Sequence, residues 1–291
     1  MTQGIDAEWT VDGLTYAGRM WGPEDGTPVL ALHGWMDHAD SFSILAPRLT
    51  GCRVVALDLS GQGLSAHRAA HATYNIWDDL PQIAGILDRL GWVQPVLMGH
   101  SRGANIAALF AAAQPDRVRA LVSLDALAPE PTQVGFAETL GKFVTDVRAQ
   151  SSRSPRTFET ADAYAARRAA QGNSAATSQA LAARALQAVD GGYQLRGDRR
   201  LFASSAVKLT QTDVEDVLRN LRCPVLNIMA RDGICTRPAL AALLTQAADL
   251  IGDYTRLDLD GDHHFHLDPT VAPHLAEAIL TFLDQRDLHT A

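Results

Sequence analysis

The stretch VLMGHSRGANIAALF, residues 96–110, decides the fold, because it joins the end of one element to the start of another. Its short apolar run is typical of a buried strand, and the alanine-rich run after Gly103 predicts a helix. Ser101 lies in the turn between them, in the pattern Gly99-x-Ser101-x-Gly103. So tight a turn strains the serine backbone and leaves no room for flanking side chains. The next N–H begins a helix and can stabilise an anion, so Ser101 is a candidate nucleophile.

Short apolar runs and helical patterns alternate on both sides of this stretch. The predicted strands are residues 28–33, 53–59, 118–124, 224–230 and 255–259, and the predicted helices are residues 76–90, 238–247 and 271–283. A turn at Asp12-Gly13 predicts a hairpin near the N-terminus. The alternation favours an α/β fold in which helices cover both faces of a mostly parallel sheet.

Residues 129–210 interrupt this alternation, since they contain helical patterns and no convincing buried strand. The predicted helices are residues 136–147, with one apolar face, and the alanine-rich residues 161–171 and 175–188. A further helix is expected to begin at the capping-box pattern Thr212-x-x-Glu215. We therefore expect a core of residues 1–128 and 211–291 with a helical insertion at residues 129–210.

Composition limits the classes of protein to which the chain can belong. Its 291 residues are 47% hydrophobic and 20% charged, as in soluble globular proteins, and can bury a large core. The formal net charge of −8 argues against nucleic acid or an anionic membrane surface as a partner. The polar N-terminus, the lack of a long apolar run and three cysteines without CxxC spacing (Cys52, Cys223 and Cys235) favour a cytoplasmic protein without disulfides.

A histidine-rich segment, GDHHFHLDP at residues 261–269, follows the last predicted strand. A serine hydroxyl is a poor nucleophile at neutral pH and needs a base, which in turn needs an orienting group. His263 is the candidate base, because it comes directly after the turn that ends the strand. Alternatively, His263, His264 and His266 form a metal cluster, but they lack cysteines and a clear carboxylate spacing. We therefore expect no metal.

The segment His33-Gly34-Trp35 follows another predicted strand and is a candidate for the second oxyanion donor. Glycine lets the backbone approach a bound acyl group, so the N–H groups of Trp35 and Arg102 are expected to face one point. A simple strand-ending turn is the alternative. The candidate substrate-binding side chains, for each of which core packing is the alternative, are Trp35, Met36, Phe42, Phe136 and Phe143.

Taken together, these motifs resemble the α/β-hydrolase superfamily over nearly the whole chain. The resemblance depends on His33-Gly34, on the loop with Gly61 and Gly63 after Asp58, on the serine turn, and on Gly261-x-His263, in that order. The stretches LHGWMDHADSF (32–42), RGDRRLF (196–202) and GDHHFHLDP look most like the serine-hydrolase-like proteins of that superfamily. The resemblance implies an eight-stranded sheet with a helical cap inserted after the sixth strand, which matches residues 129–210.

The acid that orients His263 has two candidates. Most of the superfamily carries it after the seventh strand, where Asp232 lies one residue earlier than in the usual pattern. Asp125 ends the sixth predicted strand, at a place similar to the acid site of one dehalogenase subgroup. We favour Asp125 and keep Asp232 as the alternative. Either acid would hold His263 in the correct tautomer.

The resemblance implies a cofactor-free serine hydrolase that cleaves a carboxylic ester or related acyl bond of a small molecule. Dehalogenases and epoxide hydrolases attack with an aspartate, whereas this turn presents Ser101. One alternative is a carbon–carbon bond hydrolase, in which Arg102 would recognise a substrate carboxylate; Arg102 buried in an ion pair behind the turn is the simpler interpretation. Another is a non-catalytic binding protein that kept the fold.

A glycine motif after Asp58 offers a third class of function. Residues 61–66 match G-x-G-x-x-A after a strand, which resembles a dinucleotide-binding turn. That motif requires a helix to open at its last glycine, yet residues 67–75 are a poor helix start. A nicotinamide or flavin cofactor is therefore not expected.

Overall fold

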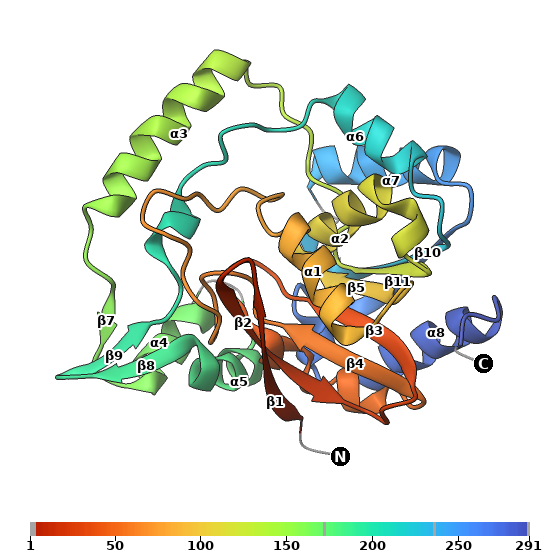
Figure 1. Cartoon of the computed structure of the whole chain (residues 1–291), viewed down its shortest axis with the longest axis horizontal. Coiled ribbons are helices and arrows are strands. Elements are labelled where there is room, and N and C mark those ends of the chain that lie inside the picture. Colours follow the sequence, from red (N-terminus) through yellow and green to blue (C-terminus); the bar gives the residue numbers. More distant parts are fainter. Residues whose placement is uncertain (1–3, 171–172, 235–236, 290–291) are drawn as a thin grey trace.

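The computed structural model describes residues 4–170, 173–234 and 237–289, and the strands of its large sheet cross the centre of the molecule (Figure 1). These strands are β1 (Ile5–Val11), β2 (Leu14–Trp21), β3 (Thr27–Leu32), β4 (Cys52–Leu57), β5 (Val96–His100), β6 (Ala120–Leu124), β10 (Val225–Asp232) and β11 (Tyr254–Asp262). Within the described residues they form one eight-stranded sheet in the order β1-β2-β4-β3-β5-β6-β10-β11. Only the β1–β2 and β2–β4 pairs are antiparallel among them, which confirms the mostly parallel sheet predicted.

Helices cover both faces of this sheet, because successive strand residues point to opposite sides. The helices outside the inserted segment are α1 (Leu80–Leu90), α2 (Arg102–Ala113), α6 (Gln211–Arg219), α7 (Pro238–Leu250) and α8 (Ala272–Asp284). Leu97 of β5 packs in the cluster that includes residues of α1, α2, α6 and α7. Its neighbours Val96 and Met98 pack on the other face, in the cluster that includes residues of α8. The alternation buries the strand on both sides, as its apolar sequence predicts.

The segment between β6 and α6 lies along one side of the molecule, with α3 at its outer edge (Figure 1). Its elements are α3 (Phe136–Ser151), β7 (Thr157–Phe158), α4 (Ala161–Ala169), α5 (Ala175–Ala185), β8 (Leu186–Val189), β9 (Gly192–Leu195) and the 3₁₀ turn η4 (Arg199–Phe202). The helices confirm the helical patterns of the sequence. The expectation of a purely helical segment is wrong, because β7, β9 and β8 form a small antiparallel sheet.

Two local predictions need correction. The helix expected over residues 175–188 ends at Ala185, and the chain continues as strand β8. The capping box lies two residues earlier than expected, since the Thr210 side chain accepts from the Asp213 N–H and the Asp213 side chain accepts from the Thr210 N–H. Asp replaces the Glu of the usual pattern and provides the same reciprocal contact.

Cys52 and Cys223 are buried free thiols, and Cys235 lies outside the described residues. No helix in the described part of the chain is both long and apolar enough to cross a bilayer.

Candidate active site

Ser101 lies between the end of β5 and the start of α2, in a backbone conformation with φ 52° and ψ −118°. A positive φ is strained for a non-glycine residue, and the crowded surroundings hold it there. A Cβ atom at Gly99 would collide with the backbone of Ala104, and one at Gly103 would collide with the Leu32 carbonyl. The two glycines of the motif are therefore required by close backbone approach on both sides of the serine.

His263 follows β11, and its ring links Ser101 to Asp125. The Ser101 Oγ lies 3.0 Å from His263 Nε2, and His263 Nδ1 lies 2.6 Å from Asp125 Oδ2. The three residues follow β5, β6 and β11, whose carboxyl ends meet at one edge of the sheet. The structure thus brings together the candidate nucleophile, the candidate base and the favoured acid.

Asp125, and not the alternative Asp232, is the carboxylate that contacts His263. Asp125 is fully buried, and it also accepts from the N–H groups of Ala230 and Ile234. A Cβ atom at Gly233 would collide with this carboxylate, so the loop after β10 leaves the space that Asp125 fills. Asp232 is exposed at the end of β10.

The backbone amides of Trp35 and Arg102 are the expected oxyanion donors. Arg102 is the first residue of α2, so its N–H belongs to the unpaired first turn of the helix. Among the described residues, neither amide has an acceptor within the protein. A Cβ atom at Gly34 would approach His100 Nδ1 to 3.0 Å, which explains the glycine before Trp35. Within the described residues, both amides therefore stay candidates for oxyanion donors.

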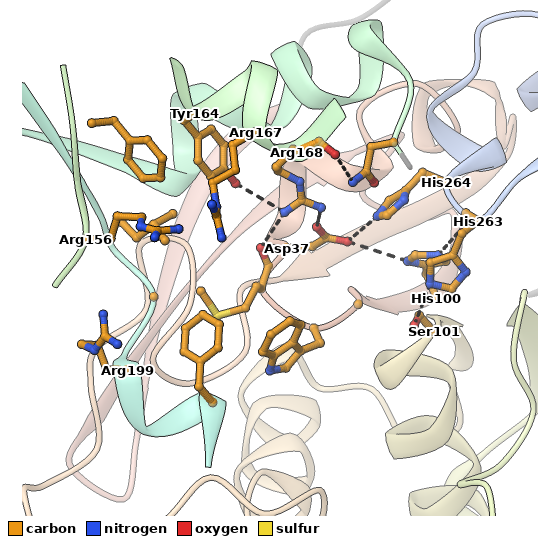
Figure 2. Close-up of a pocket in the computed structure, with 18 of the residues that line it drawn as sticks. Asp37, His100, Ser101, Arg156, Tyr164, Arg167, Arg168, Arg199, His263 and His264 are labelled. Carbon is orange, nitrogen blue, oxygen red and sulfur yellow. Dashed lines mark hydrogen bonds and ion pairs between the residues drawn. The ribbon is translucent and has the colours of Figure 1, made fainter. Parts of the chain in front are cut away.

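A cavity of about 720 Å³ opens above Ser101, between the sheet edge and the inserted segment (Figure 2). Trp35 and Met36 line it, as expected from the sequence. Trp35 also contacts the inserted segment, since its Nε1 donates to the Leu201 carbonyl over 3.0 Å and its ring packs edge-on against Phe202. The inserted segment contributes aromatic side chains that the sequence analysis did not single out: Phe158, Tyr164 and Phe202.

Three candidate pocket residues lie elsewhere. Phe42 is fully buried in the core on the α8 face of the sheet, because its 3₁₀ turn packs against the strands. Phe136 and Phe143 belong to α3, and neither lines this cavity. Phe136 is 62% exposed, since α3 lies at the outer edge of the inserted segment. Core packing explains Phe42, whereas Phe136 faces solvent and Phe143 is half-buried on α3.

Among the described residues, the Arg102 side chain neither faces the cavity to bind a substrate carboxylate nor forms the buried ion pair that was the simpler interpretation. Its Nη2 donates to the Tyr74 carbonyl over 3.0 Å, and no ion pair joins it to a carboxylate among the described residues. Burial lowers the pKa of Arg102, and the carboxylates of Asp79 and Asp78 act in the opposite direction. The side chain therefore lies behind the turn, as the simpler interpretation holds, but its partner is a backbone oxygen.

A second histidine–carboxylate group lies beside the first and was missed by the sequence analysis. Asp37 lies between Arg168 and His264, with Arg168 Nη2 2.8 Å from Oδ1 and His264 Nε2 3.0 Å from Oδ2 (Figure 2). Burial would raise the pKa of Asp37, but the charges of His264 and Arg168 outweigh burial and hold it well below its usual range. The only sequence signal was the place of Asp37, two residues after Trp35.

His100 completes this buried group. Its Nε2 lies 2.7 Å from the His263 carbonyl, so the tautomer that donates there supports the backbone of the candidate base. Burial and the neighbouring rings of His266 and His263 lower the pKa of His100 well below its ordinary value. His100 is therefore neutral at physiological pH.

The metal cluster considered from the sequence does not form. His263 uses both ring nitrogens for Asp125 and Ser101, and His266 is fully buried. A different set, Asp37, His100 and His264, has donor atoms within 4.8 Å of one another. The guanidinium of Arg168 already neutralises Asp37, so a cation there would have to displace a buried ion pair.

The glycine loop after Asp58 serves a buried carboxylate. Asp58 accepts from the N–H groups of Ala39 and Leu64 and from Arg184 Nε of the inserted segment. A Cβ atom at Gly63 would collide with this carboxylate. In residues 58–79, all of which are described, no helix opens, as the dinucleotide motif would require.

Known proteins share this architecture. The α/β-hydrolase fold family model matches residues 27–270. A serine hydrolase-like protein of Danio rerio is 31% identical over 86% of this chain and 80% of its own length. A solved hypothetical protein of Pseudomonas aeruginosa superimposes with a TM-score of 0.90 at 34% identity, covering 96% of this chain and 99% of its own. A solved E-2-(acetamidomethylene)succinate hydrolase gives 0.77 at 26% identity, covering 97% and 100%. The chain belongs to the α/β-hydrolase family.

Proposed function

We propose that this chain is a serine hydrolase that cleaves a carboxylic ester or a related acyl bond of a small molecule through an acyl-enzyme on Ser101. One observation carries the proposal: His263 contacts Ser101 Oγ at 3.0 Å and Asp125 Oδ2 at 2.6 Å at the floor of a cavity. Both separations are within hydrogen-bond reach, as a nucleophile, its base and an orienting acid require.

In the proposed first step, Asp125 accepts from Nδ1–H of His263, which leaves the Nε2 lone pair facing Ser101. As the Ser101 oxygen bonds to the acyl carbon, its proton passes to Nε2. The N–H groups of Trp35 and Arg102 stabilise the carbonyl oxygen as it becomes negative. His263 then gives that proton to the departing alcohol oxygen, and the ester bond breaks.

The second step repeats this chemistry with water. His263 takes a proton from a water molecule, whose oxygen attacks the acyl carbon, and then returns the proton to the Ser101 oxygen. One water is consumed, and one acid and one alcohol are released. The inserted segment, residues 129–210, would act as a cap in this scheme, because its side chains line the cavity opposite Ser101.

The carbon–carbon bond alternative has no supporting contact, since the Arg102 side chain that would have recognised a carboxylate donates to the Tyr74 carbonyl instead. The non-catalytic alternative is separated from the proposal by a measurement of turnover.

The test is hydrolysis of a panel of p-nitrophenyl esters of increasing acyl length by the wild type and by Ser101→Ala. The expected result is a fall in kcat of about 10³-fold or more in the variant, with an unchanged melting temperature. Ser43→Ala removes the same hydroxyl from a residue that does not line the cavity and is the matched control. Equal turnover by Ser101→Ala and wild type would overturn the proposal.

A further inference from the structure

The charge of the cavity above Ser101 is opposite to that of the whole chain. Among the described residues, its lining holds five arginines and one carboxylate, whereas the formal net charge of the chain is −8. The carboxylate is Asp37, and the buried ion pair with Arg168 already neutralises it. The arginines without such a partner among the described residues are Arg156, Arg167, Arg199 and Arg237. The lining is therefore strongly basic.

Three buried or half-buried arginines elsewhere in the chain are paired with carboxylates. Arg68 binds Asp79, Arg184 binds Asp58, and Arg200 binds Asp198. In contrast, neither the exposed Arg156 and Arg167 nor the half-buried Arg199 lies within 4.0 Å of a carboxylate in the described part of the chain. These three form what we call the arginine cluster.

Arg199 shows most clearly that a partner is missing from the cluster. Its Nη2 donates over 3.3 Å to the neutral side chain of Gln150, and its Nε is buried with no hydrogen-bond partner among the described residues. A buried donor without an acceptor is costly, so a ligand oxygen at this end of the cavity would relieve that cost. In contrast, the guanidinium of the next residue, Arg200, donates to both carboxylate oxygens of Asp198.

The arginine cluster lies on the side of the cavity away from Ser101 (Figure 2). Its members come from three parts of the inserted segment: the residue before β7, helix α4 and the turn η4. A second cavity of about 430 Å³ shares Pro155, Leu195, Gly197 and Arg199 with the first and adds Arg153, Arg196 and the Arg200–Asp198 ion pair. The basic region therefore continues outward from the serine.

We infer that the acyl substrate is elongated and carries an oxyanion (carboxylate, sulfate or phosphate) at the end remote from the bond that Ser101 attacks. The arginine cluster binds this oxyanion, because guanidinium groups form paired, charge-assisted hydrogen bonds with such groups. The aromatic side chains of Trp35, Tyr164 and Phe202 line the same cavity and supply apolar contacts for the body of the substrate. This inference depends on the proposed acyl hydrolysis at Ser101 and adds the class of substrate.

Two matched pairs of substrates test it and locate the anion. In the first pair, p-nitrophenyl hydrogen suberate has a carboxylate on its acyl part, and its methyl ester has none. In the second pair, octanoyl coenzyme A has phosphates on its leaving group, and S-octanoyl-N-acetylcysteamine has none. We expect kcat/KM to favour the anionic member of one pair by about 10- to 100-fold. The pair that shows the preference identifies the part of the substrate that carries the anion.

The double variant Arg156→Gln/Arg199→Gln is expected to reduce that preference at least tenfold. Arg222→Gln makes the same change at an exposed residue outside the cavity, and it should keep the preference of the wild type. Equal kcat/KM within both pairs, or a preference that survives the double substitution, would overturn the inference. Hydrolysis of the neutral members would show in the same experiment that the proposed acyl hydrolysis still holds.

Binding supplies a readout that does not need turnover. Calorimetric titration of Ser101→Ala with the four compounds should give a tighter Kd for the anionic member of the same pair. Binding that does not distinguish charge would overturn the inference even if no compound is hydrolysed by the wild type. Absence of hydrolysis of all four compounds, with charge-selective binding intact, would instead count against the proposed function alone.

Discussion

Two aspartate–histidine pairs lie side by side at the carboxyl edge of the sheet, and they differ in what else holds the acid. Asp125 contacts His263 at 2.6 Å, and Asp37 contacts His264 at 3.0 Å. Among the described residues, the remaining donors to Asp125 are two backbone N–H groups, whereas Asp37 also binds the Arg168 guanidinium. Neutral donors leave the charge of Asp125 available to its histidine. The guanidinium neutralises Asp37.

The two histidines also differ in exposure and in the groups that they contact. The His263 side chain is 29% exposed and reaches Ser101, whereas that of His264 is 9% exposed and faces Asp37 and His100. In the proposed mechanism, the Asp125–His263 pair transfers a proton, and the Asp37–His264 pair stabilises the structure at the base of the cavity. The two pairs have the same residue types. Their roles differ because only Asp37 binds an arginine and only His263 reaches the serine.

The largest expected effect is on the acid of the first pair. Asp125→Asn should lower kcat for p-nitrophenyl ester hydrolysis about 10³- to 10⁴-fold, because an amide no longer fixes the His263 tautomer. Asp232→Asn, at the exposed end of β10, is the control and should change kcat less than about threefold. The assay is steady-state hydrolysis at neutral pH. A larger loss in Asp232→Asn than in Asp125→Asn would reverse the assignment.

The second pair is expected to affect stability more than rate. Asp37→Asn leaves the Arg168 charge buried without its counter-ion, so the free energy of unfolding should fall by about 3 kcal/mol. Asp258→Asn removes one partner of an exposed ion pair with Arg256 and should cost less than about 1 kcal/mol. Urea unfolding followed by circular dichroism measures both values. An equal loss in the two variants would show that the Asp37 pair is not a structural support.

A smaller effect is expected from the buried histidines. Burial lowers the pKa of His266 and of His100, so both stay neutral in the folded protein while the unfolded chain binds protons near pH 6.5. The stability that depends on the neutral form is therefore complete above about pH 6.5 and is lost as pH falls below it. Each histidine contributes a slope of at most about 1.4 kcal/mol per pH unit.

Urea unfolding at pH 7.5, 6.5 and 5.5 measures this slope. His266→Phe should reduce this slope by up to about 1.4 kcal/mol per pH unit, which corresponds to one proton. The reason is that the unfolded chain then has one fewer group to protonate. His71→Phe changes an exposed histidine and should leave the slope as in the wild type. The same slope in His266→Phe and wild type would contradict the role assigned to burial.

Much of the fold could be predicted from the sequence. Buried parallel strands are continuous apolar runs, and turn residues mark where each run begins and ends. The small sheet of β7, β8 and β9 could not be predicted. Its strands have two to four residues, which is too few for a period of two to be recognised, and β8 directly continues the alanine-rich helix α5. Strand length, and not composition, limited that prediction.

The candidate site was predictable where a motif fixes the end of a strand, as at Ser101 and His263. For the acid, the family resemblance favoured Asp125 but left Asp232 open, because the contact with His263 depends on the side-chain space that Gly233 leaves beside β10. The arginine cluster was also missed, since Arg156, Arg167 and Arg199 come from a loop, a helix and a 3₁₀ turn that meet only when the inserted segment folds. Such contacts have no signature in local sequence spacing.

The most direct test of the central claim, that His263 activates Ser101, is the rate of covalent labelling by a fluorophosphonate probe. The account predicts stoichiometric labelling of the wild type, with the adduct on the Ser101 peptide in mass spectrometry. His263→Ala should react at least about 10³-fold more slowly, because no base takes the serine proton. An unlabelled wild type, an adduct on another residue, or equally fast labelling of His263→Ala would contradict it.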